Sequence, residues 1–501
     1  MSGFWSDRRV HLREPNLLYI DGQWSDASSG SAIEMVSPSD EEIHSRVAEA
    51  SSADVDRAVV AARRAFDEGP WPRLTPAERA AVLRRFAAGL RARSDEFAAA
   101  WSLQTGVPTT IARHALTNPG QMYDYYADLI ESEQLVTVTR RDSGGHAIIA
   151  REPVGVVAAI TPWNHPSHLM ALKVAPALAM GCTVVAKPAP ESPLDVFILA
   201  EVAENVGMPA GVFNIVPCGR EASEYLVSHP GIDKASFTGS AATGARIASI
   251  CASRMARSSM ELGGKSAAIV LDDIPVDQVV ATLVDGGGVR MAGQGCAFLT
   301  RVLVSRKRRN ELAEAYAEKL RGIMIGHAFD PATQMGPIAM KRQLDKVMGY
   351  IAKGRAEGAR ILTGGGRPKK LAGVPEGKGF FVEPTLFVDV TNDMTIAQEE
   401  IFGPVIAMIA YDDEAEAIRI ANDSPYGLNG AVYTNDAEKA YAIGRQVRVG
   451  NFSHNGLEHD SKYPFGGYKL SGTGREGGPY GLDIYTEVKT LYMPEPPACA
   501  A

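Results

Sequence analysis

The sequence has few cysteines, no long apolar run and no block of like charge. Its five cysteines lack CxxC or other metal-ligand spacing, which argues against a disulfide framework and a metal site and favours a reduced, cytoplasmic protein. No stretch of about 18 apolar residues occurs, and the N-terminal residues lack the apolar segment of a secretion signal, so we expect no membrane association. The net charge of −8 is not concentrated at either end, which argues against nucleic acid as a partner.

Length and composition indicate a folded protein with more than one domain. Hydrophobic residues make up 45% and charged residues 22% of the 501 residues, which is ordinary for globular proteins. A single hydrophobic core rarely serves more than about 250–300 residues. We therefore expect two or three domains.

The apolar pattern changes along the chain from helical spacing to an alternation of strands and helices. The first ~130 residues are predicted to be rich in helix, with a capping box at Thr75-Pro-Ala-Glu78. Two β-prone runs around Gly144-Gly145 predict a hairpin over 135–150. From residue 154 to 217, and again from 266 to about 449, strand-like runs alternate with helical segments. This alternation predicts two doubly wound parallel sheets, with a boundary near residue 264.

Three glycine-rich segments resemble phosphate-binding loops, but only one has a suitable position. Gly263-Gly-Lys-Ser266 lacks the earlier glycine of a Walker A loop, because residue 259 is serine. Gly472-Thr-Gly-Arg-Glu-Gly477 matches GxGxxG but lies too near the C-terminus for a βαβ unit to follow. Gly239-Ser-Ala-Ala-Thr-Gly244 follows a predicted strand and precedes a helix, so its N–H groups can face a pyrophosphate. The same segment also fits a plain strand-to-helix turn.

Three side chains have the chemistry of a catalytic site, although each also fits a simpler interpretation. Cys296 follows Ala292-Gly-Gln-Gly295, where glycines leave room for an exposed thiol; a buried cysteine without a function fits as well. Glu261 can act as a general base or lie at the surface. Asn164 closes a strand, where its amide can point into the ligand crevice of a parallel sheet. The remaining cysteines are interpreted as having no catalytic function: Cys182, Cys218, Cys251 and Cys499.

Six motifs together resemble those of the aldehyde dehydrogenase superfamily in order and spacing. They are Thr161-Pro-Trp-Asn164, Phe237-Thr-Gly-Ser240, Glu261-Leu-Gly-Gly-Lys265, Gly293-Gln-Gly-Cys296, Glu400-Ile-Phe-Gly-Pro-Val405 and Pro464-Phe-Gly-Gly-Tyr-Lys469. The resemblance covers nearly the whole chain. It implies an α/β fold with two doubly wound parallel-sheet domains plus a β oligomerisation arm. The implied parts are a dinucleotide-binding domain (1–131 and 151–263), a catalytic domain (264–480) and the arm (132–150 and 481–501).

The resemblance also implies the reaction, the oxidation of an aldehyde to the carboxylic acid. Cys296 is then the nucleophile that forms a thiohemiacetal and an acyl-thioester, with hydride transfer to NAD(P). The Asn164 amide and the Cys296 backbone N–H hold the oxyanion. Glu261 activates the water that hydrolyses the thioester, and Lys173 matches a lysine that supports the site in the family.

For the cofactor, the resemblance implies NAD, with NADP as an alternative. Pro190 stands where many NAD-preferring members carry a glutamate, and Glu191 follows it. The loss of that carboxylate removes repulsion against a 2′-phosphate, which leaves NADP open. The implied cofactor-binding residues are Ile160, Trp163, Lys187, Gly219, Gly239, Ser240, Gly244, Leu262, Glu400 and Phe402.

The implied substrate tunnel is mixed rather than purely apolar. Its predicted residues are His165, Leu169, Leu172, Phe298, His454 and Phe465. From this mixed lining we expect a medium-sized aldehyde with an aromatic or polar-substituted tail. No arginine stands out as a clamp for a carboxylated aldehyde. The histidines also fit as solvated or supporting groups.

The hairpin and the C-terminal run 484–492 match the family's oligomerisation arms, so we expect a homodimer or homotetramer. Two other activities stay as alternatives: a CoA-acylating aldehyde dehydrogenase, in which a thiol replaces water, and a non-redox thiol esterase. Glu261 argues against the first, since such enzymes commonly lack this base, and the cofactor positions argue against the second. A binding protein that has lost catalysis is a third alternative, and the presence of Cys296, Glu261 and Asn164 argues against it.

Overall fold

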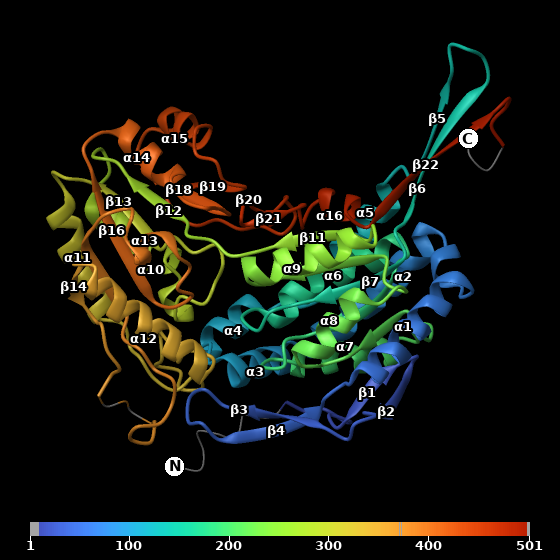
Figure 1. The fold of residues 1–501 in the computed structure, drawn as a ribbon, viewed down its shortest axis with the longest axis horizontal. Helices are drawn as coiled ribbons and strands as arrows, with labels where there is room; N and C mark the ends of the chain where they lie inside the picture. The colour runs from blue at the N-terminus through green and yellow to red at the C-terminus, as the bar shows by residue number, and fades with distance from the viewer. Residues whose placement is uncertain (1–9, 370, 372, 498–501) are drawn as a thin grey trace.

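Two mainly parallel sheets form the body of the molecule (Figure 1). The structure, a computed structural model, describes residues 10–369, 371 and 373–497. The first sheet has the strand order β21-β11-β10-β7-β8-β9, and the second has the order β14-β15-β16-β13-β12-β18-β19. In each sheet the edge strand named first runs antiparallel to its neighbour. The prediction of an α/β fold with two parallel sheets is confirmed.

The first sheet is buried on both faces. Val157 and Val184 contribute to one core, whereas Val156 and Val185 contribute to the other. Such strands occur in a sequence as continuous apolar runs, because helices cover both sides of the sheet. Its strands are β7 (Val156–Ile160), β8 (Thr183–Lys187), β9 (Phe213–Ile215), β10 (Lys234–Thr238), β11 (Arg257–Glu261) and β21 (Gly472–Thr473).

The helices around this sheet form two layers. One layer contains α1 (Ser52–Asp67), α8 (Arg220–Ser228) and α9 (Ala241–Ser253); the other contains α2 (Pro76–Arg91), α3 (Ser94–Thr105), α4 (Thr109–Ala115), α5 (Gln121–Ser132), α6 (Pro166–Met180) and α7 (Leu194–Asn205). The predicted capping box opens α2. The Thr75 hydroxyl accepts a hydrogen bond from the Glu78 N–H at 3.3 Å, and the Glu78 carboxylate accepts one from the Thr75 N–H at 2.7 Å.

The second sheet contains a buried arginine, Arg301. Its strands are β12 (Ala267–Val270), β13 (Arg301–Ser305), β14 (Arg360–Thr363), β15 (Thr385–Val390), β16 (Val405–Tyr411), β18 (Asn429–Tyr433) and β19 (Asn451–His454). The helices of this part are α10 (Val276–Gly286), α11 (Arg309–Arg321), α12 (Lys341–Ala356), α13 (Thr395–Gln398), α14 (Glu414–Asn422) and α15 (Ala437–Gly444). The Arg301 guanidinium donates to the carbonyls of Lys265, Ile420 and Ala421, which ties β13 to the end of α14.

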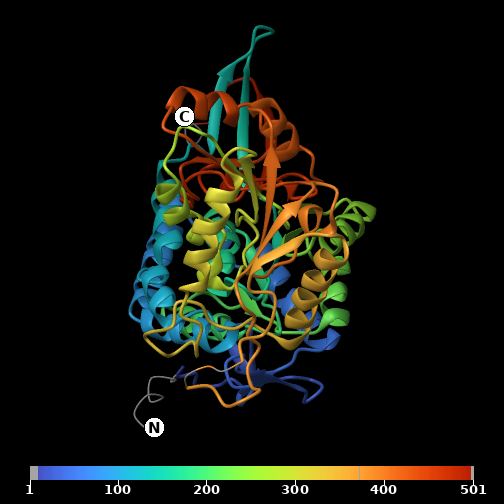
Figure 2. The same cartoon turned by 90° about the vertical axis from the view of Figure 1, so that its left-hand side faces the viewer.

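Three antiparallel strands form an arm that extends beyond the body (Figures 1 and 2). They are β5 (Val136–Arg140), β6 (His146–Pro153) and β22 (Thr486–Met493), in the order β22-β6-β5. The predicted hairpin is therefore present, and the C-terminal run pairs with it. The end of the predicted arm, 498–501 with Cys499, lies outside the described residues.

The N-terminal part differs from the expectation of a helix-rich segment. Two hairpins precede α1: β1 (Leu17–Ile20) with β2 (Gln23–Asp26), and β3 (Ala32–Val36) with β4 (Ile43–Ala48). The first turns at Asp21-Gly22, where φ is 57° and 74°. Asp-Gly is the residue pair that favours this turn, because both positions need positive φ. The sequence therefore contains the residue pair that indicates this hairpin turn.

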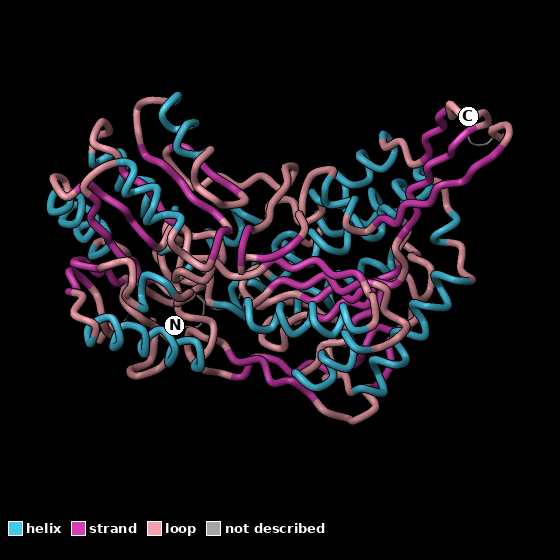
Figure 3. The backbone as a smooth tube through the Cα atoms, turned by 45° about the horizontal axis from the view of Figure 1, so that its top comes forward, coloured by secondary structure: helices cyan, strands magenta, loops and turns pink. Residues whose placement is uncertain are grey.

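The remaining elements of the described chain are short. They are η1 (Trp71–Arg73), η2 (Val289–Met291), β17 (Tyr426–Gly427), β20 (Tyr468–Lys469) and α16 (Tyr480–Asp483). Loop segments gather between the two sheets (Figure 3). Among the described helices, none has the length and apolar character that a membrane span requires.

Candidate active site

Cys296 lies in the loop between η2 and β13. It is a free cysteine, and the residue is half-buried. The loop approaches the segment after β11 closely, since a Cβ at Gly264 would lie 2.5 Å from the Cys296 carbonyl oxygen. Burial, together with the charges of Glu400 and Glu261, raises the pKa of the Cys296 thiol to about 12. The resting thiol is therefore protonated and needs a base before it can attack. The other described cysteines are buried: Cys182, Cys218 and Cys251.

Asn164 faces this loop from the segment between β7 and α6. Its side-chain amide donates to the Gln294 carbonyl at 3.0 Å, two residues before Cys296. The Asn164 carbonyl accepts a hydrogen bond from the Trp101 indole at 2.7 Å, which fixes the turn. An asparagine amide carries two N–H donors, so one stays free for a ligand. The fold thus brings two predicted catalytic segments together across 130 residues of sequence.

Glu261 ends β11 as a buried carboxylate. The residue is 4% exposed, and neither carboxylate oxygen has a hydrogen-bond partner in the described structure. Burial and the charge of Glu476 raise the pKa of Glu261, whereas Lys173 and Arg475 act in the opposite direction. A buried, unpartnered carboxylate with a raised pKa has the properties of a general base.

Lys173 and Glu476 form a fully buried ion pair behind Glu261. The side chains are 0% and 2% exposed, and the Lys173 ammonium also donates to the Thr238 hydroxyl at 2.7 Å. Lys173 is among the predicted residues and Glu476 is not, because the glycine pattern of 472–477 gives no sign that its glutamate is buried. The pair places a positive and a negative charge where both act on Glu261.

The predicted pyrophosphate segment joins β10 to the N-terminus of α9. Ser240 is the N-cap, and its hydroxyl accepts a hydrogen bond from the Thr243 N–H at 3.3 Å. The first N–H groups of such a helix are available for an anion. Gly239 precedes this cap, whereas Gly244 and Leu262 contact each other: a Cβ at Gly244 would lie 2.5 Å from the Leu262 side chain.

A second group of predicted cofactor residues lies where the two sheets meet. The Glu400 carboxylate accepts a hydrogen bond from the Gly264 N–H at 3.0 Å, and burial raises its pKa. Trp163 and Phe402 make an edge-to-face ring contact with centroids 5.3 Å apart. These contacts join Trp163, which follows β7, to the segment before β16.

The remaining cofactor predictions lie along the first sheet. Ile160 is 4% exposed and ends β7. Gly219 precedes α8. Lys187 ends β8 and is 8% exposed, and burial lowers the pKa of its ammonium. An ammonium in this position fits a ligand that carries hydroxyl or phosphate oxygens.

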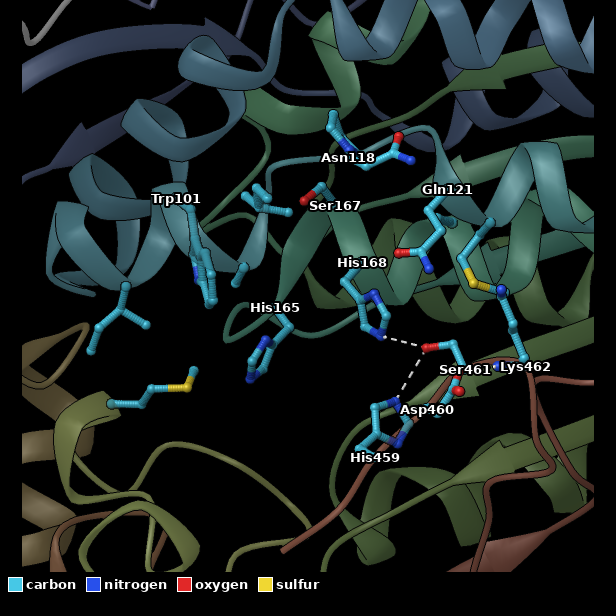
Figure 4. Close-up of a pocket in the computed structure, with 17 residues that line it drawn as sticks. Trp101, Asn118, Gln121, His165, Ser167, His168, His459, Asp460, Ser461 and Lys462 are labelled. Atoms are coloured by element: carbon cyan, nitrogen blue, oxygen red, sulfur yellow. Dashed lines mark hydrogen bonds between the residues drawn. The ribbon is translucent and has the colours of Figure 1, made fainter.

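A cavity of about 630 Å³ is lined by His165, the residue that follows Asn164 (Figure 4). Of the predicted tunnel residues, His165 lines it, and the further polar lining residues include His168, His459 and Ser461. The apolar part of the wall includes Trp101, which lies 63 residues before Asn164 in sequence. The described residues contain no cluster of three or more histidine, cysteine or acidic side chains suited to hold a metal ion.

The other predicted tunnel residues do not line this cavity. Leu172 is buried in the core, and Leu169 packs against that core. Phe298 lines a small cavity with Glu400, and Phe465 lines another with His459. His454 is exposed on β19, where its imidazole lies 2.9 Å from the Thr434 carbonyl.

Comparison with known proteins decides the family. The model of the aldehyde dehydrogenase family matches residues 24–491. The chain belongs to the aldehyde dehydrogenase family. Geranial dehydrogenase from Castellaniella defragrans is 42% identical to it over 479 residues, which cover 95% of this chain and 98% of that protein.

Solved aldehyde dehydrogenases share the fold. A Mycobacterium tuberculosis aldehyde dehydrogenase complexed with NAD+ is 44% identical, with a TM-score of 0.92 over 96% of this chain and 98% of that one. Betaine aldehyde dehydrogenase from Staphylococcus aureus in complex with NAD+ is 33% identical, with a TM-score of 0.94 over 99% of this chain and 98% of that one.

This aldehyde dehydrogenase is therefore an enzyme that oxidises an aldehyde to the carboxylic acid. The predictions of family, fold and activity are confirmed. The relatives give no support to the CoA-acylating or the esterase alternative.

Proposed function

We propose that this aldehyde dehydrogenase is a hydrolytic, NAD-dependent enzyme in which Cys296 is the nucleophile, Asn164 an oxyanion donor and Glu261 the base. The proposal rests on the grouping of three side chains. The Asn164 amide donates to the Gln294 carbonyl in the loop that holds Cys296, and the unpartnered Glu261 carboxylate acts electrostatically on the Cys296 thiol. These are the nucleophile, donor and base that acyl transfer requires.

Glu261 accepts the thiol proton of Cys296, and the thiolate then adds to the aldehyde carbon, whose oxygen becomes an oxyanion. The free N–H of Asn164 and the Cys296 backbone N–H hold this oxygen; a donor of this kind contributes about 3–4 kcal/mol. NAD, when bound, accepts the hydride. Once it has released its proton, Glu261 deprotonates a water that attacks the acyl-thioester. The carbon–sulfur bond breaks, Cys296 leaves as the thiolate and the carboxylic acid departs.

The residues around α9 and β8 fit a dinucleotide. The N-terminus of α9 at Ser240 suits the pyrophosphate, and the Lys187 ammonium suits ribose hydroxyls. Glu191, next to the replaced position Pro190, pairs with Arg342 at 2.5 Å. We propose NAD as the cofactor, in line with the NAD+ complexes of the solved relatives.

We further propose that the chain assembles into a homodimer or homotetramer through its arm. Val488, Leu491 and Tyr492 of β22 expose 65%, 44% and 68% of their surface, and an exposed sheet of this kind gains from a partner. Light scattering on the purified protein tests this.

The parts of the chain are proposed to be a dinucleotide-binding domain (1–131 and 151–263), a catalytic domain (264–480) and the arm.

A cytoplasmic location is part of the proposal. The four described cysteines are free thiols, the state that a reducing compartment maintains. Fractionation of the cells that produce the protein tests this location.

NADH absorbance with an aldehyde panel tests the proposed catalytic roles. Cys296→Ala should lower kcat by at least about three orders of magnitude, whereas Cys251→Ala, at a buried cysteine of α9, should leave kcat within about twofold. Glu261→Gln should give one burst of NADH per active site and little turnover afterwards, because the thioester then persists. Full turnover in Cys296→Ala would refute the proposed nucleophile, and unchanged turnover in Glu261→Gln would refute the water-activating role.

A further inference from the structure

Three histidines and a serine meet at one wall of the 630 Å³ cavity (Figure 4). His165 and His168 come from the start of α6, and His459 and Ser461 come from the loop after β19. The Ser461 hydroxyl lies 3.5 Å from the His168 Nε2 and 3.3 Å from the His459 Nε2. The rings of His168 and His459 stand at 84°, with centroids 5.9 Å apart. We call these four residues the histidine wall.

The histidine wall is polar but carries no charge at neutral pH. Burial, with the charges of neighbouring histidines, lowers the pKa of His165 to about 3 and that of His168 to about 4. Burial also lowers the pKa of His459. A neutral imidazole offers one N–H donor and one nitrogen acceptor, and a serine hydroxyl offers both functions. The wall can therefore give and accept hydrogen bonds without attracting an ion.

The apolar part of the cavity wall suits a planar ring. Trp101 and Ile111 line the cavity, and the Trp101 indole N–H is already used on the Asn164 carbonyl. Trp101 thus has only its ring surface left for a ligand. The centroids of the Trp101 and His165 rings lie 5.0 Å apart. The charged lining residues are Asp460 and Lys462, which are exposed and of opposite sign.

We propose that this cavity binds the tail of a neutral, hydroxylated aromatic aldehyde, with its ring against Trp101 and its hydroxyl on His168 and Ser461. The proposal rests on the proposed function, because Asn164, the oxyanion donor, directly precedes His165. An unsubstituted tail would cover the His168 imidazole and the Ser461 hydroxyl without offering either of them a hydrogen bond, which disfavours such a tail.

Steady-state kinetics with NAD and three matched substrates test the proposal: 4-hydroxybenzaldehyde, 4-methylbenzaldehyde and 4-carboxybenzaldehyde. The wild-type enzyme should show kcat/KM for the hydroxyl substrate at least about tenfold above the methyl substrate. The carboxylate should be the poorest of the three, because no arginine lines the described cavity.

Two variants test whether His168 and Ser461 cause the preference for the hydroxyl substrate. His168→Phe and Ser461→Ala should each bring the hydroxyl-to-methyl ratio of kcat/KM close to one, mainly by raising KM for the hydroxyl substrate. His11→Phe makes the same exchange at an exposed histidine and should leave the ratio unchanged. Ser461→Ala removes one oxygen atom, so it still reports on the wall if His168→Phe folds poorly.

The results separate this inference from the proposed function. If aldehydes are oxidised with no preference for the hydroxyl, with a preference for the carboxylate, or with a ratio that both variants leave unchanged, the inference about the histidine wall is wrong and the catalytic roles stand. If Cys296→Ala keeps full turnover, the catalytic proposal itself fails.

Discussion

Exchanging either member of the buried Lys173–Glu476 pair should change stability and the pH dependence of turnover together. Glu476→Gln leaves the Lys173 ammonium, which is 0% exposed, with the Thr238 hydroxyl and an amide in place of a carboxylate. Breaking a buried ion pair from one side costs about 3–5 kcal/mol, because a charge then stays buried without compensation. We expect a cost near the lower end, about 3 kcal/mol, since glutamine keeps an acceptor oxygen.

The corresponding change in Tm follows from the size of the chain. At about 2.1 cal/mol/K per residue, the 501 residues have an unfolding entropy of about 1.05 kcal/mol/K, so about 3 kcal/mol lowers Tm by about 3 °C. Differential scanning calorimetry measures this shift. Lys341→Met is the matched control, since Lys341 pairs with Asp345 at the surface with side chains 70% and 60% exposed. Its cost should stay below about 0.5 kcal/mol.

The two single variants should move the acidic limb of the kcat profile in opposite directions. The Glu476 charge raises the pKa of Glu261 and the Lys173 charge lowers it. The base Glu261 works when ionised, so Glu476→Gln should shift the limb to lower pH and Lys173→Met to higher pH, each by about one unit or more. If the acidic limb of the kcat profile stays in place in both variants, or moves in the same direction in both, this account of Glu261 is wrong. The double variant Lys173→Met/Glu476→Leu should be more stable than either single variant, because no charge is left buried alone.

Three further predictions concern the loop, the histidines and the second sheet. Gly264→Ala places a Cβ 2.5 Å from the Cys296 carbonyl oxygen, so steady-state assays should show kcat lower by about 10²-fold; an unchanged kcat would mean that the loop yields freely. The pKa values of His165 and His168 are lowered from 6.5 to about 3 and about 4, so their neutral forms stabilise the fold above pH 6.5, and this stability is lost as the pH falls toward 4 and then 3. His168→Phe should therefore lose less Tm than the wild type between pH 7 and pH 4.5 in a thermal-shift assay, and equal losses would contradict the lowered pKa. Arg301→Leu leaves the carbonyls of Lys265, Ile420 and Ala421, which lie beside the second sheet, without their donor and should destabilise the protein by at least about 3 kcal/mol in urea unfolding; a change below about 1 kcal/mol would show that water replaces the guanidinium.

The sequence by itself determined the fold class and the chemical groups of the site. Strands buried on both faces must be apolar throughout, so β7 and β8 are visible as runs such as Val156–Ile160. A thiol, an amide and a carboxylate are fixed by residue type alone, and short glycine-rich segments mark where Cys296 and Glu261 lie. The Asp21-Gly22 turn of the first hairpin is equally local, because this residue pair favours positive φ at both positions.

Only the tertiary structure decided which of these groups meet and in what protonation state. The contact of Asn164 with Gln294 spans 130 residues, and that of Lys173 with Glu476 spans 303. Such pairs depend on how the two sheets and their loops pack, which no local pattern encodes. Burial likewise raises the pKa of Cys296 and Glu261 and lowers that of His168, because the energy of a charge depends on the surrounding medium rather than on its neighbours in sequence. The residue types were thus readable from the chain, whereas their partners and their charges were set by packing.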